Sequence, residues 1–98
     1  MNERVIWKIT LNMTDVQSIE VPIGSKFLYV GAHGLGEQFD HINVWFLCDP
    51  SSPKEKRIVT IRGTGHPASS DDGDYIGTAV MLGGKLVFHV FVKPRQEL

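Results

Sequence analysis

The C-terminal part of the chain holds two β-forming stretches, Tyr75–Leu82 and Lys85–Lys93, joined by the glycine pair Gly83-Gly84. Two adjacent glycines supply the positive φ angles that a two-residue hairpin turn requires, and such a turn fixes the register of both strands. The expected pairs are Leu82 with Lys85, Met81 with Leu86, Val80 with Val87, Ala79 with Phe88, Thr78 with His89, Gly77 with Val90, Ile76 with Phe91 and Tyr75 with Val92. Both faces of this hairpin are largely apolar. We therefore expect one face to line the core and the other to be covered by loops or by a second subunit.

The rest of the chain also has the pattern of strands. Apolar and polar residues alternate in Val5–Leu11 and Ile19–Ile23, Lys26–Val30 is rich in β-forming residues, Ile58–Arg62 is a further expected strand, and Ile42–Cys48 is an almost continuous apolar run. Alternation is typical of strands, because successive side chains point to opposite faces. Pro22 cannot donate a ladder hydrogen bond, which predicts an edge position for its strand. The spacing predicts an all-β fold, a small antiparallel β-sandwich or barrel of about seven strands ending in the Gly-Gly hairpin.

Length and charge limit the classes of protein to which the chain can belong. Its 98 residues suffice for a single domain, residues 1–98. The net charge is −1, which argues against a dedicated binder of nucleic-acid polymers and gives no support for a membrane role. The single cysteine, Cys48, cannot form an internal disulfide, and the N-terminus lacks an apolar run of signal-peptide length. We expect a cytoplasmic protein without a cofactor.

The segment Arg62-Gly63-Thr64-Gly65-His66 is the best candidate for a ligand site. Backbone N–H groups beside glycines can converge on an anion, the Thr64 hydroxyl adds a donor, and Arg62 and His66 can add positive charge. We therefore predict that these residues bind a phosphate or carboxylate group. The glycine spacing is not that of a P-loop or of a dinucleotide-binding turn. A glycine-rich strand exit is the alternative interpretation.

Patterns for catalysis or metal binding are weak. The four histidines lack the close helical spacing of a zinc motif, so we predict no metal site and no catalytic residue. His89 lies opposite Thr78 in the expected hairpin, where a hydrogen bond between the two is predicted. The acidic run from Ser69 to Asp74 is typical of a solvated turn. The apolar surroundings of Cys48 predict an inert thiol with a raised pKa.

Aromatic residues exceed what one face of a thin core needs. Core filling is the default interpretation, and the alternative is a subunit interface, where aromatic side chains are enriched. We assign Trp45, Phe46 and Phe91 to such an interface. Together with the apolar residues on both faces of the hairpin, they predict a homo-oligomer.

Several segments carry a resemblance to known proteins. They are Val5–Lys8, Asp49-Pro50, Pro53–Arg57, Gly63–Pro67, Tyr75–Thr78 and Gly83–Phe91. In these segments the chain resembles a family of short proteins of tailed phages and of bacteria that carry phage DNA. The resemblance covers most of the chain and is strongest from Asp49 onward, while this chain has extra residues around His33 to His41. It implies a phage or prophage accessory protein acting in the host cytoplasm, and little about chemistry.

Three functions compete at this point. The first is a non-catalytic binding module that captures a small anionic ligand, such as a nucleotide signal of host defence, at Gly63–Pro67. The second is a protein-interaction module that inhibits a host protein or assembles with other phage proteins. The apolar residues on both faces of the hairpin favour this function. The third is a small hydrolase with His66 as its base and Asp71, Asp72 or Asp74 as the partner of that base.

Overall fold

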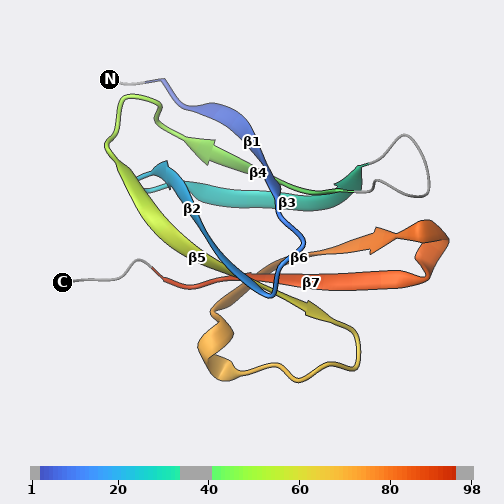
Figure 1. Ribbon diagram of the computed structural model, residues 1–98. Coiled ribbons are helices and arrows are strands. Elements are labelled where there is room, and N and C mark those ends of the chain that lie inside the picture. Colours follow the sequence, from blue (N-terminus) through green and yellow to red (C-terminus); the bar gives the residue numbers. More distant parts are fainter. Residues whose placement is uncertain (1–2, 34–40, 95–98) are drawn as a thin grey trace.

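The computed structural model describes residues 3–33 and 41–94, which form seven antiparallel strands in two sheets (Figure 1). The strands are β1 (Val5–Leu11), β2 (Val16–Pro22), β3 (Lys26–His33), β4 (His41–Cys48), β5 (Lys54–Gly63), β6 (Asp74–Met81) and β7 (Leu86–Val92). The described ranges also contain two short 3₁₀ turns, η1 (Ser70–Asp72) and η2 (Leu82–Gly84). The predicted all-β class is confirmed. Of the extra residues around His33 to His41, residues 34–40 lie outside the described residues.

The two sheets have the strand orders β1-β4-β3 and β2-β5-β7-β6. β2 is an edge strand, which confirms the position predicted from Pro22. Neither sheet closes on itself, and the sheets meet where β3 passes β6. At that point a Cβ added to Gly77 would lie only 2.6 Å from the Cβ of Val30. The approach of the two sheets therefore depends on a residue without a side chain. No helical element in the described ranges is long and apolar enough to span a membrane.

The core lies between the sheets and receives buried side chains from every strand. Its members are Leu11, Ile19, Val21, Val30, Ile42, Val44, Phe46, Cys48, Val59, Ile61, Ala79, Met81, Val90 and Val92. On β4 every second residue from Ile42 to Cys48 belongs to this set, as strand alternation requires. Full burial of one such side chain stabilises a fold by about 1.5–3 kcal/mol relative to exposure. The inward faces of the two sheets thus hold the molecule together.

The hairpin of β6 and β7 follows the predicted register in the five pairs from Met81–Leu86 to Gly77–Val90, while Leu82 and Lys85, a predicted pair, lie between the strands and outside the ladder. The turn residues Gly83-Gly84 have φ angles of 63° and 94°, as the predicted turn requires. Beyond Gly77 a β-bulge shifts the ladder by one residue.

The bulge makes the two predicted pairs at the base of the hairpin wrong. Tyr75 pairs with Phe91 rather than Val92, and Asp74 takes the place opposite Val92. Ile76 has no partner in this ladder and packs against the core. Periodicity could not reveal the shift, because a bulge inserts one extra residue on one strand while both strands stay rich in apolar residues. The new register brings the rings of Tyr75 and Phe91 together, with centroids 5.8 Å apart.

Replacing Gly77 with alanine is expected to destabilise the fold by about 1–3 kcal/mol, because the added methyl group overlaps Val30. Urea unfolding of both proteins measures the loss. The swapped variant Gly77→Ala, Val30→Gly is the matched test. Its loss in free energy of unfolding should be smaller than the sum of the losses of Gly77→Ala and Val30→Gly, because the side chain that overlaps the new methyl group is removed. Strict additivity would contradict the role assigned to this contact.

Candidate functional site

β5 ends in a tight turn formed by Gly63, Thr64, Gly65 and His66. The backbone N–H of His66 donates to the carbonyl oxygen of Gly63 over 3.0 Å, and Gly65 has a φ angle of 86°. A positive φ at the third residue is what a type II turn requires, which explains the second glycine of the segment. The backbone N–H of Thr64 donates to the carbonyl oxygen of Val87 over 3.2 Å. The turn is thereby tied to β7.

The first glycine of the turn makes room for the side chain of His66. A Cβ at position 63 would lie 2.9 Å from Nδ1 of His66, so the imidazole ring lies directly against the backbone at the end of β5. The backbone N–H groups of Thr64 and His66 both donate within the protein. Two donors of the predicted anion cradle are therefore already used. Side chains, more than the backbone, are left to define a ligand site here.

Arg62 forms an ion pair with Asp72. Its Nε and Nη2 atoms donate to the two carboxylate oxygens over 3.0 and 2.8 Å. The backbone N–H of Ser69 donates to the same carboxylate over 3.0 Å. The bond from Arg62, followed by that from Ser69, lowers the pKa of Asp72 from 3.8 to about 2. Asp72 is only 3% exposed, so the interpretation of the acidic run as a solvated turn is wrong for this residue.

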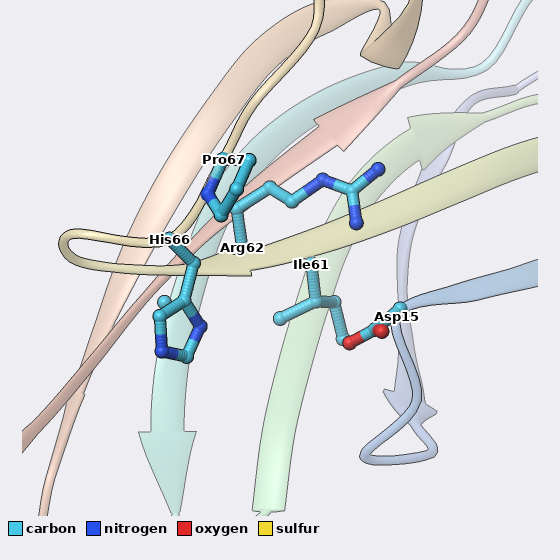
Figure 2. A pocket seen from close by; sticks show the side chains of 6 residues that line it. Asp15, Ile61, Arg62, His66 and Pro67 are labelled. Carbon is cyan, nitrogen blue, oxygen red and sulfur yellow. The ribbon is translucent and has the colours of Figure 1, made fainter.

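Arg62 and His66 do not converge on one point. In Figure 2 the guanidinium group and the imidazole ring extend in different directions. The hollow that they border has a volume of about 260 Å³ and is lined by Asp15, Ile61, Arg62, Gly63, His66 and Pro67. Asp15 puts a carboxylate group into this wall, and Arg62 is already neutralised by Asp72. Both facts disfavour an anion in this hollow.

A larger hollow, of about 370 Å³, shares Gly63 and His66 and extends to the end of the β6–β7 hairpin. We call it the hairpin hollow. Its lining residues are Gly63, Thr64, His66, Gly84, Lys85, Leu86, Val87 and Phe88. None of these described lining residues carries a carboxylate group. The hairpin hollow thus combines an apolar wall from β7 with the polar groups of Thr64, His66 and Lys85.

Hydrogen-bonded side chains connect β5, β7 and β6 beside the hairpin hollow. Oγ1 of Thr64 lies 2.9 Å from Nε2 of His89, and Nδ1 of His89 lies 3.0 Å from Oγ1 of Thr78. The Thr78 hydroxyl also bonds to the hydroxyl of Tyr75. The predicted bond between His89 and Thr78 is confirmed. The contact with Thr64 was missed, because it depends on the pairing of β5 with β7 across a long loop.

This geometry gives little support to hydrolysis. A histidine base is usually oriented by a carboxylate, whereas both ring nitrogens of His89 contact threonine hydroxyls. Asp72, one predicted partner of His66, is bound to Arg62. Within the described ranges no group of three or more His, Cys, Asp or Glu residues could hold a metal ion. Burial, followed by the charge of Asp49, raises the pKa of the Cys48 thiol, as predicted.

The aromatic residues assigned to an interface lie in different surroundings. Phe46 is 3% exposed and belongs to the core, because it occupies an inward position on β4; a core role replaces the predicted interface role. Trp45 is half-buried on the other side of β4 and contacts the ring of Tyr29. Phe91 is half-buried in the four-stranded sheet, against Tyr75. Trp45 and Phe91 therefore belong to two different surfaces, and the homo-oligomer stays a prediction.

Comparison with known proteins identifies the family of the chain. A family model described as a domain of unknown function (DUF7352) matches residues 2–98. No curated protein and no solved structure matches the chain. Because the match spans both sheets, the turn after β5 and the hairpin hollow lie within the family domain.

Acid should weaken the fold through Asp72. The pKa of Asp72 is about 2 in the folded protein, against an ordinary value of 3.8. The carboxylate therefore adds to the free energy of unfolding above about pH 4, and this added stability is lost as the pH falls towards 2. We expect the urea midpoint of the wild type to fall over this range. Asp72→Asn should be less stable than the wild type at neutral pH, and its urea midpoint should fall less between about pH 4 and pH 2.

The matched control for this measurement is Asp71→Asn, at the exposed neighbouring residue. It should keep the acid response of the wild type, since Asp71 does not pair with Arg62 in the described structure. An Asp72→Asn variant with the midpoint of the wild type at neutral pH and an unchanged acid response would contradict the role given to the ion pair.

Proposed function

Since the chain belongs to the DUF7352 family, a domain family of unknown function, we propose its function from the site itself: it is a non-catalytic module that binds a small anionic ligand in the hairpin hollow. One observation carries this proposal. The turn after β5 meets the end of the β6–β7 hairpin, so that the ammonium group of Lys85, the polar side chains of Thr64 and His66, and apolar side chains line one hollow of about 370 Å³. Ligand pockets in proteins have volumes from about 300 to 1,000 Å³, so the volume of this hollow suits a ligand of mononucleotide size.

The lining suits a ligand with one anionic end and one flat apolar end. The ammonium group of Lys85 and the imidazole of His66 line the hollow and can bind a phosphate or carboxylate, while the Thr64 hydroxyl, which lies 2.9 Å from Nε2 of His89, is part of the polar lining. Leu86, which is 41% exposed, and Phe88 offer an apolar surface against which a ring can lie. A nucleotide combines these two features, which is why we propose a nucleotide-like ligand.

Arg62 has a supporting role in this proposal. Its bond to Asp72 ties η1 to β5 immediately before Gly63, and so helps to fix the start of the turn. Of the predicted ligand-binding residues the proposal therefore keeps the side chain of His66, with Thr64 as part of the polar lining, and it adds Lys85. Lys85 follows the hairpin turn in sequence and joins the site only because β5 pairs with β7.

The setting we propose follows from the resemblance to short proteins of phages and prophages. A module without a catalytic group acts on a small ligand by holding it. Sequestration of a nucleotide signal of host defence, in the cytoplasm of an infected bacterium, fits that mode of action.

Isothermal titration calorimetry against a panel of linear and cyclic nucleotides tests the proposal. We expect at least one nucleotide to bind the wild type and Lys85→Glu to weaken this binding by about tenfold or more, because the variant puts a carboxylate into the hairpin hollow. The matched control is Lys54→Glu, which reverses the charge of an exposed lysine at the start of β5, outside that lining.

If Lys85→Glu and Lys54→Glu weakened nucleotide binding equally, the effect would come from overall charge, and the assignment of the ligand to the hairpin hollow would be contradicted. An absence of heat across the whole panel, at protein concentrations of about 0.1 mM that detect micromolar affinity, would contradict a nucleotide-like ligand.

A further inference from the structure

The β1-β4-β3 sheet presents a second surface, on the side away from the core. Strand pairing arranges its side chains in two rows, Ile6–Leu47–Lys26 and Lys8–Trp45–Tyr29. We call these residues the outer face. Ile6 and Tyr29 are 60% and 62% exposed, while Trp45 and Leu47 are half-buried. Apolar side chains at this exposure on adjacent strands form a contiguous patch, which marks a site of interaction more often than scattered single residues do.

Two aromatic rings form the centre of the outer face. The ring centroids of Tyr29 and Trp45 are 5.6 Å apart. The Tyr29 ring also lies over Gly31, where an added Cβ would be 2.8 Å from its Cε2 atom. The glycine therefore leaves room for the ring to lie against the sheet, beside Trp45. Aromatic surfaces of this kind carry much of the binding energy at protein interfaces.

The charge of the outer face differs from that of the whole chain. The chain has 11 Asp+Glu residues and a net charge of −1. β1, β3 and β4 contain none of these acidic residues, and the charged side chains of the outer face are Lys8 and Lys26, both exposed. The described carboxylates nearest in sequence, Glu3 and Asp49, lie beyond the ends of β1 and β4. The outer face is thus apolar at its centre and positive at its margin.

We propose that the outer face binds an acidic protein segment with apolar anchor residues. Its apolar and aromatic side chains would contact Ile6, Trp45 and Tyr29, and its carboxylates would pair with Lys8 and Lys26. This partner matches both properties of the surface, since apolar contact supplies affinity and charge complementarity supplies orientation and specificity. The proposal concerns a different sheet from the hairpin hollow and does not depend on the nucleotide proposal.

Charge argues against two other occupants. A second copy of the chain, docked through the same face, would bring four lysines together with no carboxylate from β1, β3 or β4 to pair with them. A nucleic-acid strand needs several phosphate contacts, and two lysines supply few of them. The aliphatic residues Ile6 and Leu47 also have no role in stacking against bases.

A random-peptide display library, panned against the wild-type chain, provides the probe. The variant Lys8→Glu, Lys26→Glu serves as the counter-target. We expect enrichment of peptides that combine Asp or Glu with leucine or aromatic residues. Fluorescence polarisation of an enriched peptide should show about fivefold weaker binding for each single reversal, Lys8→Glu and Lys26→Glu, and little change for Lys54→Glu.

Further readouts make the result decisive. Circular dichroism checks that both reversals leave the fold intact, and amide chemical shifts should change on β1, β3 and β4 when the peptide binds. Enrichment of peptides without acidic residues, or equal binding to the counter-target, would overturn the proposal. Two other outcomes would also overturn it: binding of an oligothymidylate, or self-association seen in sedimentation. Either would count if the two lysine reversals abolished it and left peptide binding unchanged.

Discussion

The contact between two small sheets is the constraint on which the rest of the structure depends. A sheet with one apolar face must bury that face against another element, and here the three-stranded and four-stranded sheets bury one face against each other. Gly77 sets how closely β6 can approach β3, because Val30 occupies the space that a side chain would need. Because one face of each sheet is buried against the other sheet, the opposite faces point to solvent and can contact a partner.

The long connection from β5 to β6 is held in place by polar groups, in contrast to the apolar core. The carboxylate of Asp72 accepts from Arg62 and Ser69, and the Thr60 hydroxyl donates to the backbone carbonyl of Asp72 over 3.1 Å. A charge that is 3% exposed is tolerated only when it is paired in this way. The network uses the arginine that the sequence offers to a ligand, and leaves Thr64 and His66 exposed at the turn.

The two surfaces for which we propose partners are built by different means. The hairpin hollow is assembled from the end of β5 and the beginning of β7, and its polar side chains, Thr64, His66 and Lys85, lie on turns. The outer face is built on three paired strands, so its spacing is set by the ladder itself. A small ligand needs a concave site with a few convergent groups, whereas a protein segment needs a wider and flatter surface. Each surface has the shape that its proposed partner requires.

Local features of the chain were sufficient to predict much of the fold. Alternation, β-forming residues and an apolar run predicted the strands, Pro22 predicted an edge, and Gly83-Gly84 set the hairpin register as far as Gly77, because side-chain direction and turn geometry depend on residues close in sequence. The burial of Asp72, the core position of Phe46, the bulge before Gly77 and the contact between Thr64 and His89 were decided only by the tertiary structure. Each of these depends on which strands pair and which faces meet, and those choices are made between segments far apart in the chain.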